Sequence, residues 1–110
     1  MNEDIRLKRN CDFDRVFKNG KKVFGKTLLF LYIKEQSLKI GYCVSKKHGK
    51  AVERNKIKRL LRAAMRENIS EINGKYYIVV LPKVCEEYSF DGFKSDLKKI
   101  IKKELSKDDK

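Results

Sequence analysis

The residues most able to do chemistry lie between positions 45 and 62, in the stretch SKKHGKAVERNKIKRLLR. Eight of its eighteen residues are Lys or Arg, and Glu53 is its one acidic residue. Guanidinium groups hold a phosphate through two parallel hydrogen bonds, and ammonium groups add compact positive charge. The chemistry that this stretch indicates is therefore the binding of a polyanion.

The second half of this stretch has the periodicity of an amphipathic helix over residues 52–68. At about 100° per residue, one arc of the helix holds apolar side chains: Ile57, Leu60, Leu61, Ala64 and Met65. The opposite arc holds five cations and an amide: Arg54, Asn55, Lys58, Arg59, Arg62 and Arg66. A solvated face usually mixes charges of both signs, whereas Arg54, Lys58 and Arg62 repel one another along one face. The pattern therefore favours an anion-binding face over a merely solvated one.

The turn before this helix, SKKHGK, adds Lys46, Lys47 and Lys50. Gly49 can adopt a turn conformation that is closed to other residues. Backbone N–H groups at a helix N-terminus attract anions, so the three lysines would gather where an anion is already favoured. This turn is not a nucleotide-binding phosphate loop, because Gly49 and Lys50 are followed by Ala51 and not by the Ser or Thr of the GxxxxGKS or GxxxxGKT spacing.

No set of residues forms a convincing catalytic or metal-binding pattern. His48 is the only histidine, and it has no Ser, Cys or Asp partner at a motif spacing. The three cysteines are far apart and show no CxxC spacing: Cys11, Cys43 and Cys85. We interpret them as free thiols in a reducing compartment. The residues argue against an enzyme that acts alone.

The composition indicates one small domain with an anionic partner. The 110 residues carry a net charge of +13, far more than solubility requires, and 41% of them are hydrophobic. Nucleic acid is the first expected partner, an anionic membrane surface the second and an acidic protein the third. No apolar run approaches the roughly 20 residues of a membrane span. The start MNEDIRLKRN lacks the apolar segment of a secretory signal, so we expect a cytoplasmic protein.

Helices are predicted at both ends of the chain. Asn10 can cap a short helix that ends near Gly20. Its shared face holds Phe13, Val16 and Phe17. Ser89 or Asp91 can cap a final helix, whose inner face is apolar: Phe93, Leu97, Ile100, Ile101 and Leu105. Its outer face is basic: Lys98, Lys99, Lys102 and Lys103. Residues 106–110 are expected to form a frayed tail.

Strands are predicted at residues 26–35, 38–47 and 75–83, with a brief extra strand at Val23 and Phe24. The short EQS between the first two strands suits a hairpin, so we expect these two to pair antiparallel. Pro82 ends the last strand or marks a sheet edge. The order is helix, two or three strands, helix, strand, helix, which predicts an α+β fold with helices packed on one sheet.

Two features leave alternatives open. Phe13 and Phe17 can be ordinary core residues, or they can be aromatic platforms beside a basic groove, as in single-stranded nucleic-acid binding. Residues 28–32 are apolar on both faces of their predicted strand. The second face is therefore either covered by a helix or part of a groove.

The central motif resembles the signature of the bacterial ribonuclease P protein subunit. The matching positions form a Lys pair, a Gly, an Ala-Val and an Arg-Asn-x-x-Lys-Arg run with a further Arg: Lys46, Lys47, Gly49, Ala51, Val52, Arg54, Asn55, Lys58, Arg59 and Arg62. The N-terminal RLKRNCDFDRVFKNG is similar to the family's opening at Arg6, Leu7, Phe13, Phe17 and Gly20. The late YYIVVLPK also fits, so the resemblance covers nearly the whole chain.

The resemblance implies a protein cofactor of a ribozyme that removes the 5′ leader from precursor tRNA. In this family the large RNA and its Mg²⁺ carry out the hydrolysis, so no residue of the protein is expected to be catalytic or to bind metal. By position, the residues expected to contact the catalytic RNA are Lys46, Lys47, Lys50, Arg54, Asn55, Lys56, Lys58, Arg59 and Arg62. Those expected to line a groove for the single-stranded leader of precursor tRNA are Phe13, Phe17, Leu29 and Leu31.

The resemblance also implies a fold. It is a single RNA-binding domain over residues 1–110, with a small antiparallel or mixed sheet of about four strands and three helices. The order is α-β-β-β-α-β-α, as in a domain of a small-subunit ribosomal protein. Its strand–helix–strand crossover is left-handed, although the general rule predicts a right-handed one.

The sequence departs from the family pattern at two positions. Lys56 stands where many members have Arg, which keeps the charge but loses the planar two-point grip. Leu31 stands where an aromatic residue is expected in the groove strand, unless Tyr32 serves there through a change of register.

Two other classes of function use similar residues. A ribosomal or general RNA-binding protein would use the same basic helix, and a preference for precursor over mature tRNA would argue against it. A DNA-binding regulator would place residues 54–66 in a major groove. That class lacks support because strands, not a second helix, are predicted on both sides of the basic helix.

Overall fold

The computed structural model describes residues 6–7, 9–84 and 88–105. Its elements follow the predicted order: α1 (Asn10–Asn19), β1 (Lys21–Phe24), β2 (Leu28–Lys34), β3 (Lys39–Tyr42), the short helix η1 (Lys46–His48), α2 (Ala51–Asn68), the short helix η2 (Ile69–Glu71), β4 (Tyr76–Pro82) and α3 (Phe90–Glu104). The predictions for Cys85 and for residues 106–110 fall outside the described residues. None of the helices in the described ranges combines the length and the apolar character needed to span a membrane.

The four strands form one mixed sheet in the order β1-β2-β4-β3. β1 pairs antiparallel with β2, β2 pairs antiparallel with β4, and β4 pairs parallel with β3. Because β3 and β4 are parallel, the chain between them must cross over, and α2 makes that crossover. The α+β class and the mixed four-stranded sheet are confirmed, and the left-handed sense of the crossover stays a prediction.

The predicted hairpin between the second and third strands is wrong. β2 and β3 run in opposite directions, but β4 lies between them and pairs with both. The physical reason is burial: Ile78, Val79 and Val80 of β4 are 0% exposed, so this strand is the most stable at the centre of the sheet. The hairpin forms instead between β1 and β2, where the Gly25 N–H donates to the Leu28 carbonyl at 2.8 Å.

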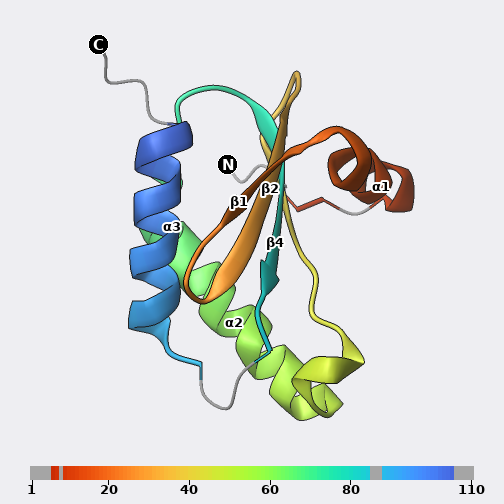
Figure 1. Cartoon of the computed structure of the whole chain (residues 1–110), viewed down its shortest axis with the longest axis vertical. Helices are drawn as coiled ribbons and strands as arrows, with labels where there is room; N and C mark the ends of the chain where they lie inside the picture. Colours follow the sequence, from red (N-terminus) through yellow and green to blue (C-terminus); the bar gives the residue numbers. More distant parts are fainter. Residues whose placement is uncertain (1–5, 8, 85–87, 106–110) are drawn as a thin grey trace.

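One face of the sheet, here called the helix face, is closed by α2 and α3. The strands contribute Leu28, Phe30, Ile40, Ile78 and Val80. The helices contribute Ile57, Leu61, Ala64, Met65, Phe93, Leu97, Ile100, Ile101 and Leu105. The predicted inner faces of both helices are therefore confirmed by burial. Figure 1 shows α3 on the opposite side of the sheet from α1.

The other face, here called the α1 face, is covered by α1 and by Leu7. The alternate side chains of the two inner strands point to it: Leu29, Leu31 and Ile33 of β2, and Tyr77, Val79 and Leu81 of β4. Phe13, Val16 and Phe17 of α1 pack on these residues, so their predicted shared face is confirmed. Only four members of this cluster are buried: Leu7, Val16, Leu31 and Val79. β2, which is apolar on both faces, is thus covered by α2 and α3 on one face and by α1 and Leu7 on the other.

Helix and strand ends agree with the prediction at three of four positions. Ser89 caps α3, since its hydroxyl accepts from the Gly92 N–H at 3.0 Å. Gly20 follows α1, and Pro82 ends β4. The prediction that Asn10 caps α1 is wrong, because the helix begins one residue earlier. The Arg9 carbonyl already accepts from the Phe13 N–H at 3.2 Å, which leaves Asn10 as the first helical residue.

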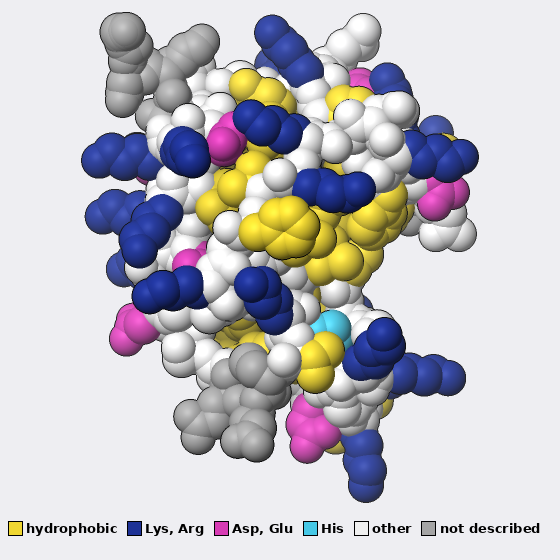
Figure 2. Space-filling model, viewed as in Figure 1, with side chains coloured by type: hydrophobic (Ala, Val, Ile, Leu, Met, Phe, Trp, Pro, Cys, Tyr) yellow, Lys and Arg dark blue, Asp and Glu magenta, His cyan; other side chains and the backbone are white. Residues whose placement is uncertain are grey.

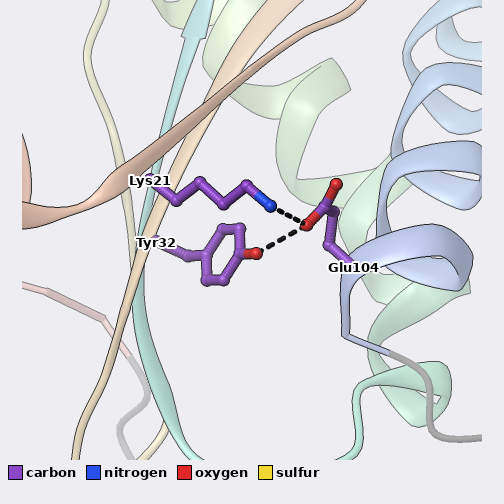
Figure 3. A network of polar contacts seen from close by, with 3 residues as sticks. All are labelled: Lys21, Tyr32 and Glu104. Atoms are coloured by element: carbon purple, nitrogen blue, oxygen red, sulfur yellow. Dashed lines mark hydrogen bonds and ion pairs between the residues drawn. The ribbon is translucent and has the colours of Figure 1, made fainter.

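The end of α3 is attached to the β1–β2 hairpin by a small polar network (Figure 3). The Tyr32 hydroxyl donates to Glu104 Oε1 at 2.6 Å, and Lys21 Nζ donates to the same oxygen at 3.0 Å. The hydrogen bond from Tyr32 is the main cause that lowers the pKa of Glu104. Burial, together with Glu104, raises the pKa of Tyr32. Tyr32 therefore belongs to the helix face and cannot replace the missing groove aromatic.

Candidate nucleic-acid interface

α2 separates its apolar and basic residues as the periodicity predicts. Ile57, Leu61, Ala64 and Met65 are at most 3% exposed. The exposed polar side chains are Glu53, Asn55, Lys56, Arg59, Arg62, Arg66 and Glu67, with Arg54 and Lys58 half-buried. The apolar side chains fix the helix on the sheet, so the backbone positions that carry the basic side chains are held in a constant arrangement. No backbone ordering is then needed when these positions meet an extended polyanion.

Arg54 is the most constrained cation of this face. Its Nε–H is buried and finds no hydrogen-bond acceptor within residues 6–7, 9–84 and 88–105. Removing a donor from water without a partner costs about 1–3 kcal/mol. Because this nitrogen is closed to solvent, a phosphate oxygen would reach it only if the Arg54 side chain moved.

The turn that precedes α2 is fixed by its own hydrogen bonds. The Ser45 hydroxyl accepts from the Lys47 N–H at 3.3 Å, and the Lys50 N–H donates to Glu53 Oε1 at 2.9 Å. Gly49 has φ 118°, the conformation for which the sequence predicted a glycine. Lys46, Lys47 and Lys50 are all exposed at this turn. The predicted gathering of lysines before the helix is therefore present.

His48 links this turn to the end of β4. Its Nδ1 accepts from the Ser45 N–H at 3.0 Å, so its Nε2 carries the proton that is donated to the Pro82 carbonyl at 2.7 Å. Its ring also lies 6.4 Å from that of Tyr88. These contacts give the only histidine a positioning role between the turn and the end of β4.

The strand register places a row of apolar side chains across the α1 face, beyond the part that α1 covers. Phe24 of β1 pairs with Leu29 of β2, and Leu29 pairs with Leu81 of β4. Cys43, directly after β3, donates its N–H to the Val80 carbonyl at 3.0 Å and packs in the same cluster as Leu81. We call Phe24, Leu29, Leu81 and Cys43 the outer row. Figure 2 shows exposed hydrophobic side chains between α1 and the start of α2, with Lys and Arg side chains around them.

Three of the four residues predicted to line a groove reach the surface in part. Phe13, Phe17 and Leu29 are half-buried on the α1 face. Phe13 lies directly on β3, since a Cβ built on Gly41 would stand 2.5 Å from Phe13 Cζ. Leu31 is 0% exposed because it lies beneath α1 beside Val79, so its side chain cannot contact a ligand in this structure.

The basic face and the outer row adjoin each other. Burial raises the pKa of the Cys43 thiol, and the nearby positive charge of Lys58 opposes that rise. Burial also raises the pKa of Tyr42 to about 12, against the opposing charges of Arg62 and Arg66. The cations of α2 therefore act on β3 and on the end of the outer row. The basic face and the outer row therefore lie close to each other at Cys43.

Sequence reasoning missed two residues of this surface. Phe24 is 72% exposed on the α1 face, although the sequence analysis assigned it only to a short strand. Strand alternation could have found it, because Val23 packs on the helix face and its neighbour must point the other way. Gly41 makes room for Phe13, and no local pattern predicts that contact because it joins residues that are far apart in the sequence.

A sequence model of the family described as Ribonuclease P matches residues 1–104. The chain belongs to the ribonuclease P protein family. It is 35% identical over 109 residues to the ribonuclease P protein component of Finegoldia magna, and the matched region covers 97% of this chain and 96% of that protein. It is 37% identical over 101 residues to the component of Clostridioides difficile, which covers 88% and 89%. Family membership makes the chain a protein component that associates with the RNA of ribonuclease P.

Solved ribonuclease P proteins have the same fold. The structure of the Staphylococcus aureus protein superposes with a TM-score of 0.81 at 27% identity, covering 96% of this chain and 100% of that one. The Thermotoga maritima protein gives a TM-score of 0.77 at 31% identity, covering 93% and 97%. The family fold predicted from the central motif is therefore confirmed.

The described residues include no metal-binding cluster. Among residues 6–7, 9–84 and 88–105, no three His, Cys, Asp or Glu side chains gather closely enough to hold a metal ion.

Proposed function

We propose that this protein assists removal of the 5′ leader from precursor tRNA by holding two RNA strands on two adjoining surfaces. The basic face of α2 binds the catalytic RNA, and the α1 face binds the single-stranded leader. The observation that carries this proposal is that a fixed cationic helix adjoins a half-exposed row of apolar side chains at Cys43 and Lys58. We place this activity in the cytoplasm.

On the α2 side, the contacts to the catalytic RNA are contacts to phosphate. We assign them to Lys46, Lys47, Lys50, Arg54, Asn55, Lys56, Lys58, Arg59 and Arg62. Their charges offset the repulsion between RNA segments that approach each other, so the holoenzyme needs less Mg²⁺. Binding of this kind releases counterions, and its affinity falls steeply as salt is raised.

On the α1 side, the leader lies against Phe13, Phe17 and Leu29, while Leu31 supports them from beneath. Aromatic side chains stack on any base, so they hold a single strand without requiring one sequence. At Cys43 this surface meets the cations of α2. We assign the hydrolysis and its Mg²⁺ to the RNA, and the protein supplies position and charge.

The experiment that tests the role of the protein is cleavage of a precursor tRNA at low Mg²⁺ by a bacterial ribonuclease P RNA, with and without the protein. We expect strong stimulation by the protein and no cleavage by the protein alone. The salt concentration is held constant, because the protein–RNA affinity depends on it. Failure to stimulate a cognate RNA, with the protein folded, would reduce the role to general RNA binding.

A second measurement tests the α1 face. Phe17→Ala is expected to weaken holoenzyme binding of leader-bearing precursor by about 5-fold or more, because one stacking contact is worth about 1–3 kcal/mol. Binding of mature tRNA should change little. Lys102→Ala, on the outer side of α3, is the control for a general loss of charge or folding. If Phe17→Ala weakened binding of precursor and of mature tRNA equally, Phe17 would be an ordinary packing residue and not a leader contact.

A further inference from the structure

Phe24 is an aromatic side chain that the fold leaves in solvent. The large hydrophobic residues that are exposed in the described ranges are Phe24, Val52 and Val84. Phe24 is the aromatic one among them, and it is 72% exposed. A Phe side chain that stays in water gives up about 1.5–3 kcal/mol of the stabilisation that burial would supply. The exposure of this ring is therefore better explained by a ligand that covers it than by packing within the protein.

The register of the hairpin sets the direction of this ring. Phe24 pairs with Leu29, which packs in the α1-face cluster, whereas its neighbour Val23 packs on the helix face. Phe24 therefore stands at the β1 end of the outer row, on the same face as the residues assigned to the leader. The row crosses four strands, a span of about 14 Å at about 4.8 Å between neighbours.

The strand end that carries Phe24 is held firmly. The N–H and the hydroxyl of Thr27 both donate to Asp96 Oδ2 at 2.5 Å, and Asp96 is 5% exposed. The Lys83 N–H donates to the Thr27 carbonyl at 2.9 Å. The loop that follows Phe24 is thus tied to α3 and to the chain after β4. A ring on a fixed strand can bind a flat partner with a small loss of entropy.

The charge around Phe24 selects among possible partners. Lys22 stands two residues earlier on the same face, Lys26 is in the hairpin loop, and both are exposed. A second copy of this chain would bring another +13 of net charge against these lysines. One aromatic ring between lysines is also too small an apolar area for a stable dimer, which needs about 800 Å² on each partner. In a nucleotide, the base can stack on the Phe24 ring while the phosphate pairs with the lysines.

We propose that Phe24 is a stacking site for an unpaired base of the RNA leader, at the end of the outer row away from α2. This inference rests on the proposed function, because it extends the path assigned to the leader. The path passes Phe13 and Phe17, crosses Leu29 and ends on the β1–β2 hairpin. Phe24 thereby supplies the aromatic contact that Leu31 and Tyr32 do not.

The test in the holoenzyme uses precursors that differ only in leader length. Phe24→Ala should weaken binding of precursors with long leaders by about 5-fold or more, the range expected for one lost stacking contact. Precursors with the shortest leaders, and mature tRNA, should bind as they do to the unchanged holoenzyme. Val84→Ala is the matched control, since Val84 is 58% exposed and lies outside the outer row.

A second test reads the contact directly. The chain has no tryptophan, so Phe24→Trp introduces the one tryptophan, whose emission can be excited separately from that of the five tyrosines, and keeps an aromatic ring. We expect its emission to be quenched by a single-stranded oligoadenylate and left unchanged by inorganic polyphosphate, which has charge but no bases. Phe24→Trp should also retain the long-leader affinity that Phe24→Ala loses.

The outcomes separate this inference from the proposed function. If Phe24→Ala binds every leader length normally while Phe17→Ala loses the precursor, the leader path is correct and Phe24 is not part of it. Equal quenching by polyphosphate and by oligoadenylate would show that charge, not stacking, acts at this position, and would overturn the inference. If the unchanged holoenzyme itself shows no preference for precursor over mature tRNA, the proposed function fails.

Discussion

The two faces of the sheet use the same kinds of side chain but are covered to different extents. On the helix face, fourteen apolar residues are buried and eleven more are partly buried around them. On the α1 face, four residues are buried and seven more are only partly covered. Most apolar residues of the helix face are therefore buried, whereas most of those on the α1 face retain apolar surface that a ligand can cover.

The difference follows from the size of the covering elements. A ten-residue helix such as α1 is about 15 Å long and about 10 Å wide. The sheet is about 14 Å wide across its four strands, and its two inner strands, of seven residues each, are about 23 Å long. One short helix cannot cover that area, and the outer row lies in the part left over. An apolar strand residue thus becomes part of a core or part of a binding surface according to what is packed above it.

The largest expected effect is the loss of a helix-face side chain. Phe93 is 1% exposed between α3 and the sheet, and Phe93→Ala should lower the free energy of unfolding by about 3–5 kcal/mol. Phe24→Ala, on the open face, should change it by about 0.5 kcal/mol or less, as is usual for a surface substitution. Urea denaturation followed by circular dichroism measures both. Similar losses for the two variants would mean that the α1 face is as closed as the helix face.

The sequence predicted most of the helix face because its signals are local. Periodicity assigned both sides of α2 and of α3, and it assigned Phe13, Val16 and Phe17 to one face of α1. It failed where the deciding contact joins distant segments. The EQS turn favoured a hairpin, but the burial of β4 between β2 and β3 outweighs it.

The candidate site was predictable to the extent that its residues are charged or belong to the family motif. The α2 cations follow from spacing alone, whereas the burial of Leu31 and the exposure of Phe24 depend on where α1 stops. A strand that is apolar on both faces gives no indication of which face is left open. That information lies in the length of a helix relative to the sheet.

The second prediction separates the two sides of α2. Arg54→Ala should weaken binding to the catalytic RNA by about 10- to 150-fold, the worth of a charged hydrogen bond of about 1.5–3 kcal/mol. It should not lower stability, because it also removes a buried donor that has no acceptor among the described residues. Leu61→Ala, on the buried side, should lower stability by about 2–5 kcal/mol instead. Filter binding over a range of salt concentrations measures the affinity of Arg54→Ala for the RNA. The slope of log affinity against log salt concentration should become shallower by the amount that corresponds to about one phosphate contact. An unchanged affinity for Arg54→Ala would mean that this face does not contact the RNA.

The third prediction concerns the support of Phe13 on the α1 face. Gly41→Ala would bring a Cβ within 2.5 Å of Phe13 Cζ, so the ring must move or the strands must separate. We expect a loss of about 1–3 kcal/mol in stability, as for other overpacked sites. The same change should be much less costly in a Phe13→Ala background, because the two residues are in direct contact. A double-mutant cycle by urea denaturation measures this coupling, and additive losses would contradict it.

The smallest expected effect is at the polar network that attaches α3 to the sheet, and it depends on pH. The pKa of Glu104 is lowered in the folded protein, chiefly by the hydrogen bond from Tyr32. Folding therefore favours the ionised carboxylate, and the stabilisation is fully present above the unfolded pKa of about 4.3. It is lost as the pH falls through the lower, folded value. Lys21 contributes little, because its side chain is 63% exposed and an exposed ion pair is screened by water.

Two variants separate the two partners of Glu104. Tyr32→Phe should lower the free energy of unfolding at neutral pH by about 1 kcal/mol, the usual worth of one hydrogen bond. This difference from the unchanged protein should shrink in acid as Glu104 becomes protonated. Lys21→Ala is the matched control and should have a smaller effect. Urea denaturation at several pH values measures both, and a Tyr32→Phe difference that stays constant down to the acid limit would assign the stabilisation to packing of the ring instead of to the carboxylate. The helix face would then be closed at its edge by apolar contact alone, and its contrast with the open α1 face would depend on covered area and not on this polar link.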